Sequence, residues 1–253
     1  MNERWKGFAR RWVLPFADPH RLGSFALLPK FLVELKRYRA LTTDESVDWS
    51  DVYPCLSDRV GQTPFDPHYF YQGAWLARCL ALTKPRFHVD IGSSVTMLSV
   101  LAAGTPIVFL DYRPLVTQIR GFRCVCGTAT QLPFADNTIS SLSSLHVIEH
   151  IGLGRYGDPL DPYGSKQAAA ELVRVLEPGG HLFLSVPVGR ERVCFNAHRV
   201  FAPRTILSCA QGVRLETFSL IDDAGRFQER VAIEAAADLE YGCGLFEFVK
   251  AGV

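Results

Sequence analysis

The sequence lacks three features that would each narrow its function: a large charge of one sign, a long apolar run and paired cysteines. Lys and Arg number 27 against 26 Asp and Glu, and this balance argues against a dedicated nucleic-acid binder, which would be strongly basic. No apolar run reaches the roughly 18 residues that a membrane span needs, and no signal-peptide pattern opens the chain. The seven cysteines are odd in number and contain no Cys-x-x-Cys pair, which is typical of a reducing compartment. We therefore expect a cytoplasmic protein.

The composition fits an α/β protein with an additional lobe. Hydrophobic residues make up 48% of the chain and charged residues 21%, so a full core can form without disulfides or metal. We expect an N-terminal helical and loop extension over residues 1–84 and the main domain over 85–253. Residues 1–40 carry nine Lys or Arg against three Asp or Glu. This basic, aromatic-rich segment either packs over a neighbouring domain or makes peripheral contact with an anionic membrane surface.

From residue 86 onward, strand and helix patterns alternate, which predicts a mostly parallel sheet. The stretch 86–103 fits a buried strand, a tight turn at Gly92 and a helix that begins near Ser93 or Ser94. Another helix is expected over 68–84, whose aromatic side chains either fill the core or roof a pocket. The later pattern predicts strands at 106–111, 122–127, 139–147, 181–188, 214–220 and 244–250, and helices at 114–120, 165–176 and 203–211. The predicted fold is Rossmann-like α/β: a doubly wound sheet of about seven strands.

Two carboxylates end neighbouring strands of this predicted sheet. Asp90 ends the first strand, and Asp111 ends the second strand 21 residues later. In an open parallel sheet, ligands bind outside the carboxyl ends of the strands. An acid about 20 residues beyond the first one is placed to accept hydrogen bonds from ribose hydroxyls. We favour this ribose interpretation over the alternative, in which Asp111 only caps a helix.

Four segments carry a resemblance to a known family: VDIGSS at 89–94, VFLDYRP at 108–114, GTATQLPFADNTISSLSSLHVIEHI at 127–151 and ELVRVLEPGGHLFLSVPV at 171–188. In this order they resemble the motifs of class I S-adenosylmethionine-dependent methyltransferases, over about residues 86–190. GRYGDPLDPYGS and CFNAHRVF, beyond the fourth motif, resemble a narrower methyltransferase-like group of unassigned function. The resemblance implies S-adenosylmethionine as the cofactor.

The resemblance also implies which residues hold the methionine end of that cofactor. Asp90 and Gly92 would bind it, with its carboxylate near the N–H groups of Ser93 and Ser94. His146, at the end of the fourth strand, would lie beside it. The first turn departs from the family pattern because it contains one glycine where the family usually has two or three.

For the adenosine end, the resemblance implies that Asp111 accepts the ribose hydroxyls and that Tyr112 stacks near the adenine. Thr128 and Ala129 occupy the place where these enzymes often carry an acid that binds the adenine amino group. Thr128 in place of that acid is the second departure from the family pattern.

A zinc-peptidase spacing overlaps the fourth strand, since His146-Val-Ile-Glu149-His150 satisfies H-x-x-E-H. Such a site needs a continuous helix through 146–150. Instead, a serine-rich apolar strand runs directly into His146, and Gly152 and Gly154 follow closely. We therefore expect no metal site, and we expect Glu149 and His150 to orient the loop by hydrogen bonds.

The candidate catalytic base is His198, because imidazole titrates near neutrality. Arg155, Tyr156, Asn196 and Arg199 are the candidate substrate-binding residues, suited to an anionic or sugar-like acceptor. In the alternative interpretation, Asn196 and His198 fix a loop and Arg199 pairs with a carboxylate.

The sequence therefore predicts an S-adenosylmethionine-dependent methyltransferase that transfers a methyl group to oxygen of a small-molecule or glycan-type acceptor. The alternative is a catalytically inactive protein of the same fold that serves as a binding or scaffold module. The single glycine of the first turn and Thr128 motivate this alternative.

Overall fold

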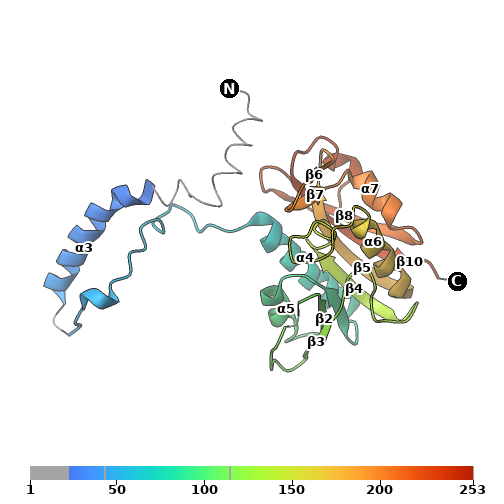
Figure 1. The fold of residues 1–253 in the computed structure, drawn as a ribbon, viewed down its shortest axis with the longest axis horizontal. Helices are drawn as coiled ribbons and strands as arrows, with labels where there is room; N and C mark the ends of the chain where they lie inside the picture. The colour runs from blue at the N-terminus through green and yellow to red at the C-terminus, as the bar shows by residue number, and fades with distance from the viewer. Residues whose placement is uncertain (1–22, 43, 114, 253) are drawn as a thin grey trace. The chain divides into compact units, whose positions relative to one another are not determined.

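The computed structural model describes residues 23–42, 44–113 and 115–252 (Figure 1). The chain divides between Pro64 and Phe65 into two compact units. The helix expected over 68–84 therefore belongs to the unit that holds the sheet, although the sequence analysis assigned it to the N-terminal extension. Most of the basic N-terminal segment, residues 1–22, lies outside the described residues.

In the described part of the first unit, α3 (Leu28–Leu41) follows a 3-10 turn, η1 (Phe25–Leu27). Pro29 stands in the first turn of α3, where its missing N–H costs no hydrogen bond. The following segment folds back on the helix because Arg39 Nη2 donates to the Val47 carbonyl at 2.7 Å. The Arg39 guanidinium also lies 4.5 Å from the ring centroid of Trp49, within η2 (Trp49–Asp51). Among the described residues of the whole chain, none forms a helix long and apolar enough to cross a membrane.

The second unit is built on an eight-stranded sheet of order β3-β2-β1-β4-β5-β10-β8-β9. The first five strands along the chain pair in parallel, and β10, β8 and β9 add antiparallel pairs at one side. This arrangement confirms the predicted Rossmann-like fold. The strands are β1 (His88–Ile91), β2 (Ile107–Asp111), β3 (Phe122–Cys126), β4 (Ile139–Leu145), β5 (Leu176–Val188), β8 (Val213–Ile221), β9 (Phe227–Gln228) and β10 (Gly242–Lys250).

Helices cover both faces of the sheet (Figure 1). α4 (Pro67–Thr83) and α5 (Val95–Leu101) lie on one face, and α6 (Gly164–Val175) and α7 (Pro203–Cys209) lie on the other. Side chains of a strand alternate between faces, so Phe183 of β5 packs in the cluster of α4 with Trp75. Its neighbours Leu182 and Leu184 pack in the cluster of α6 with Leu172. The core thus consists of two apolar layers separated by the sheet.

Two expectations about local structure are wrong. Residues 115–120 form no helix, because the segment is short and its β-branched Val116, Thr117 and Ile119 disfavour the helical state. The polar segment after β5, where the sequence predicted no strand, contains a hairpin of β6 (Arg192–Cys194) and β7 (His198–Val200). A further 3-10 turn, η3 (Ile233–Ala236), precedes β10.

The order of the strands reverses between β1 and β4, because β2 and β3 extend from one side of β1 and β4 and β5 from the other. In open α/β sheets the ligand crevice lies at this point, outside the carboxyl ends of the strands. Asp90, Asp111 and His146 all stand at or directly beyond those ends.

Candidate active site

Asp90 stabilises the turn after β1 through hydrogen bonds to its buried carboxyl group. Its side chain is fully buried, and it accepts hydrogen bonds from the Ser93 N–H at 2.9 Å and the Ser93 hydroxyl at 2.7 Å. The Ser143 hydroxyl of β4 donates to the same carboxyl group. Burial raises the pKa of Asp90 to about 6, against the opposing effect of these hydrogen bonds. Asp90 therefore shapes the turn from inside the protein.

The turn itself depends on Gly92, whose φ of +72° is a conformation that residues with a side chain rarely adopt. A Cβ at this position would lie 3.0 Å from Val147 Cγ1 and 3.8 Å from Asp111 Oδ2. The Ser93 hydroxyl accepts from the Leu145 N–H at 2.9 Å, which ties the turn to the end of β4. Ser94 occupies the N-cap position of α5.

Asp111 ends β2 opposite this turn. Its Oδ1 accepts hydrogen bonds from the Arg113 N–H at 2.7 Å and from Arg113 Nε at 3.3 Å. These bonds fix the carboxylate beside Gly92, so the structure brings together the two groups on which the sequence prediction depends. Tyr112 follows with half of its surface exposed.

A cavity of about 120 Å³ lies between these groups, and we call it the cofactor cavity. Asp90, Ser93 and Ser94 are not among the described residues that line it. Of the predicted cofactor-binding residues, its lining includes Gly92, Asp111, Tyr112, Thr128, Ala129 and His146.

The inserted loop between β4 and α6 covers the cofactor cavity. Tyr156, Asp158 and Pro159 of this loop line the cavity, and the Arg113 guanidinium lies 4.6 Å from the Tyr156 ring centroid. Asp158 Oδ2 accepts from the Gly152 N–H at 2.7 Å and so fixes the base of the loop. Tyr156, expected among the acceptor-binding residues, thus lines the cofactor side of the site.

A second cavity of about 490 Å³, which we call the acceptor cavity, lies beside the first. It brings together the predicted His198, Asn196 and Arg155. The His198 ring packs against Tyr241 with centroids 5.1 Å apart. Burial and then the neighbouring His150 lower the pKa of His198, so its imidazole is neutral at pH 7 and able to accept a proton. The full lining is Asp66, His68, Tyr69, His146, Glu149, His150, Arg155, Asn196, Ala197, His198 and Tyr241.

His146 and His150 line both cavities, which therefore adjoin at these two residues. His146 has a positive φ of 54°, held by its N–H, which donates to the Ser185 carbonyl at 2.9 Å. Its Nδ1 lies 2.8 Å from Glu149 Oε1. Burial lowers the pKa of His146, but Cys243 and Glu149 outweigh this effect and raise the pKa well above 6.5. Residues 146–150 form turns, and the H-x-x-E-H histidines do not share a helical face.

Three comparisons place these features among known proteins. A profile of a family described as "Caenorhabditis protein of unknown function, DUF268" matches residues 129–233, which is less than half of the chain. No curated protein sequence matches.

The N-methyltransferase NodS from Bradyrhizobium japonicum WM9, solved with S-adenosyl-L-homocysteine, is similar with a TM-score of 0.51 and 15% identity. The match covers 73% of this chain and 88% of that chain. A proposed sarcosine dimethylglycine methyltransferase from Galdieria sulphuraria also has a TM-score of 0.51 at 15% identity, covering 73% and 86%. This protein has the class I methyltransferase fold. The resemblance carried by the four sequence motifs is thereby confirmed for the fold.

Within this methyltransferase fold, Arg199 has a structural position. Its side chain is buried, and Nη1 donates to the Ile151 carbonyl and to the Ser165 hydroxyl, both at 2.7 Å. Burial lowers its pKa. Arg199 thus joins the hairpin to the start of the inserted loop and to α6, and it is not among the described residues that line the acceptor cavity.

Part of the acceptor cavity of this methyltransferase fold was not predicted from the sequence. His68 and Tyr69 come from the first turn of α4, where Asp66 caps the helix by accepting from both of their N–H groups. Tyr241 directly precedes β10. Burial and then the neighbouring His146 lower the pKa of His68 to about 4. The aromatic run at the start of α4 was the one available signal, and it did not distinguish a pocket roof from core packing.

Proposed function

We propose that this protein transfers a methyl group from S-adenosylmethionine to a hydroxyl oxygen of a small-molecule or glycan-type acceptor. The observation that carries the proposal is the pair of adjoining cavities at the carboxyl ends of the strands. Asp111 lines one of them, His198 lines the other, and His146 and His150 line both. Ligand sites of open α/β sheets occupy this position.

The residues of the cofactor cavity fit the proposed cofactor. Gly92 leaves a space that a Cβ would fill, next to the Asp111 carboxylate, and a carboxylate there is suited to ribose hydroxyls. Tyr112 offers an aromatic ring for the adenine, and Thr128 offers a hydroxyl where an acid is usual. S-adenosylmethionine supplies a methyl group on a sulfonium, which reacts by direct displacement.

His198 is the proposed general base. Its lowered pKa keeps the imidazole neutral, so it could accept the proton that an acceptor hydroxyl loses when its oxygen takes the methyl group and the cofactor's sulfur leaves as a thioether. Asn196 and Arg155 line the same cavity and are the proposed contacts to the acceptor's polar groups. The inserted loop with Tyr156 excludes water from the neighbouring cofactor cavity.

A transfer assay tests this assignment. Protein, radiolabelled S-adenosylmethionine and a small-molecule extract should yield labelled products, and His198→Gln should lower their formation about 100-fold or more, the contribution of a general base, without changing cofactor affinity. His181→Gln is the matched control, because His181 pairs with Glu247 at 3.1 Å and lies outside the acceptor cavity. Equal labelling by wild type and His198→Gln would contradict the role of His198.

One observation favours the second candidate, a non-catalytic binding or scaffold module. The cofactor cavity measures about 120 Å³, below the roughly 300–1,000 Å³ of ordinary ligand pockets. Cofactor binding would therefore need a wider cavity, and Tyr156 of the inserted loop, which packs on Arg113, is the lining residue that we propose moves. A folded wild-type protein that gives neither heat nor a thermal shift with millimolar S-adenosylmethionine would exclude methyl transfer and leave this second candidate.

We also propose that the basic N-terminal segment makes peripheral contact with anionic membranes. Its described part, α3, presents Lys30, Lys36 and Arg37 beside exposed apolar side chains such as Leu32 and Val33. This combination suits an interfacial helix. Sedimentation with vesicles of phosphatidylserine and phosphatidylcholine should pull the protein down in a salt-sensitive manner, and an equal soluble fraction with and without vesicles would contradict the contact.

A further inference from the structure

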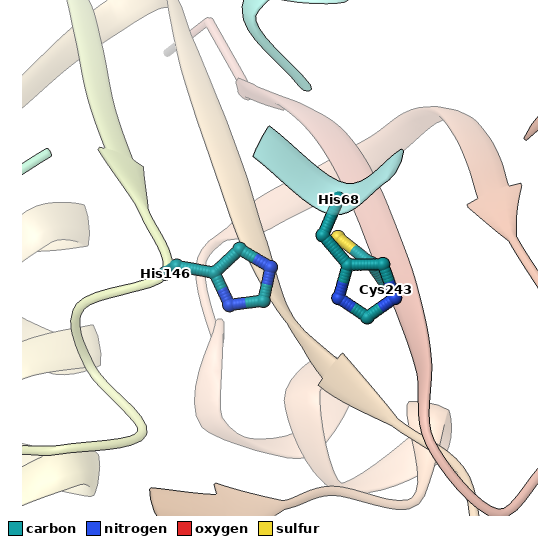
Figure 2. Close-up of side chains that lie close together, drawn as sticks. All are labelled: His68, His146 and Cys243. Carbon is teal, nitrogen blue, oxygen red and sulfur yellow. The ribbon is translucent and has the colours of Figure 1, made fainter. Parts of the chain in front are cut away.

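Three side chains with metal-ligating atoms lie close together, and two of them, His68 and His146, line the acceptor cavity. His68 begins α4, His146 follows β4, and Cys243 is the second residue of β10. One ligand atom of each lies within 4.8 Å of the others, and Figure 2 shows the His146 ring directed toward His68 and Cys243. We propose that His68, His146 and Cys243 bind a zinc ion.

The hydrogen bonds of His146 support this proposal independently. Its Nδ1 contacts the Glu149 carboxylate at 2.8 Å, whereas its Nε2 is buried and makes no hydrogen bond of ordinary geometry with the described residues, although the Cys243 thiol lies beside the ring. The whole side chain is 7% exposed. A zinc-bound histidine typically donates its other ring N–H to a carboxylate, which fixes the tautomer and the ring orientation. Glu149, itself 1% exposed, occupies the place of that carboxylate and is a positioning residue.

The donor set and the spacing both suit zinc. Two imidazole nitrogens and one thiolate match a borderline-soft cation that prefers tetrahedral nitrogen and sulfur coordination. In such a site neighbouring ligand atoms are about 3.3–3.6 Å apart, as Zn–N and Zn–S bond lengths require. In this structure the ligand atoms lie within 4.8 Å of one another. Side-chain rotation would have to bring them about 1 Å closer together. The His68 and His146 rings are nearly parallel, with centroids 5.5 Å apart, and one of them must turn.

Three protein ligands leave a fourth tetrahedral position, as in catalytic zinc sites. His68 and His146 line the acceptor cavity, so the fourth ligand is a water or a group of the acceptor in that cavity. A hydroxyl bound there would lose its proton more readily. This last consequence rests on the proposed methyl transfer, whereas metal binding itself does not.

The site differs from the H-x-x-E-H pattern of the sequence. That pattern would pair His146 with His150, but the two do not share a helical face, and His150 Nδ1 contacts the Ala197 carbonyl. His68 and Cys243 take the place of His150, and Glu149 acts through His146. In the competing interpretation, the same residues form a metal-free cluster in which His68 stacks between His146 and Tyr241.

A cobalt titration distinguishes the two interpretations. The full chain is stripped with chelator and titrated with Co²⁺, whose spectrum reports tetrahedral geometry and thiolate-to-metal charge transfer, and bound Co²⁺ is then displaced with Zn²⁺. We expect one equivalent to bind with a charge-transfer band. Cys243→Ser should abolish that band, and Glu149→Gln should weaken affinity about 10- to 100-fold.

Two further variants make the test decisive. Cys79→Ser is the matched control, since Cys79 is another buried thiol of the same unit, and it should leave the spectrum unchanged. His68→Gln alters a half-buried side chain at a helix start, so it reports on the site even where Cys243→Ser fails to fold. Absence of stoichiometric binding by folded wild type, binding without the charge-transfer band, or unchanged affinity in His68→Gln would overturn the proposal. The titrations contain no S-adenosylmethionine, so their outcome is separate from that of the methyl-transfer assay.

Discussion

Replacing Gly92 by alanine perturbs the turn that forms one wall of the cofactor cavity. With φ at +72°, a side chain at this position costs about 1–2 kcal/mol of folding free energy. The new Cβ would also lie 3.0 Å from Val147 Cγ1, and such overpacking typically adds about 1–3 kcal/mol. We therefore expect Gly92→Ala to destabilise the protein by roughly 2–5 kcal/mol, the sum of these two effects.

The matched control is Gly179→Ala, near the start of β5. Its φ is +79°, and a Cβ there would have no described heavy atom within 4 Å beyond its chain neighbours. This control carries the backbone cost alone, about 1–2 kcal/mol. Urea unfolding of both variants should show the larger loss for Gly92→Ala, and Val147→Ala in the same chain should recover part of the excess. Equal losses in the two variants would refute the close packing of Gly92 against Val147.

Three further predictions concern Asp90, Arg199 and the cover of the cofactor cavity. Burial raises the pKa of Asp90 to about 6, so the folded state binds the carboxyl proton more tightly than the unfolded state. The resulting contribution to the free energy of unfolding is fully present below the unfolded pKa near 3.8 and is lost as pH rises through 6. In urea titrations, the free energy of unfolding of Asp90→Asn relative to wild type should therefore rise by about 3 kcal/mol from pH 4 to pH 8. A difference between the two proteins that does not change with pH would contradict this prediction. Arg199→Met leaves the Ile151 carbonyl and the Ser165 hydroxyl without their hydrogen bond from Arg199. It should lower the free energy of unfolding by about 3 kcal/mol in the same assay. Unchanged stability with weaker binding of the methyl acceptor would instead indicate that Arg199 contacts the substrate. Tyr156→Ala removes the contact with Arg113 and should speed cofactor association in stopped-flow measurements, which an unchanged rate would refute.

The sequence predicted the parts of the fold and the site that are local in the chain. The apolar run ending at Asp90, the glycine after it and the acid at Asp111 each belong to one strand and its turn. The parallel sheet then brings the ends of neighbouring strands together, so the proximity of Gly92 to Asp111 followed from the expected topology. The helix expected over 114–120 is absent from residues 115–120, because so short a pattern does not distinguish a helix from an extended segment.

The remaining parts of the site depend on contacts between distant segments. His68, Tyr241 and Cys243 meet His146 only because the start of α4 and the start of the antiparallel strand β10 both lie near the carboxyl ends of the parallel strands. No local pattern marks these residues. Burial likewise separates Arg199, which bonds inside the protein, from the neighbouring His198, which lines a cavity. The sequence alone shows two adjacent cationic or titratable residues in a polar loop and does not reveal which one is buried.

Calorimetric titration with S-adenosylmethionine tests the central assignment, that Asp111 and the Gly92 turn bind this cofactor. Wild type should bind one equivalent. Asp111→Asn should bind roughly 10- to 100-fold more weakly, because it loses the charge-assisted bonds to the ribose, each worth about 1.5–3 kcal/mol. Asp136→Asn, which alters an exposed carboxylate paired with Arg174, should bind as wild type does. Absence of heat with folded wild type, or equal affinity in wild type and Asp111→Asn, would contradict the assignment.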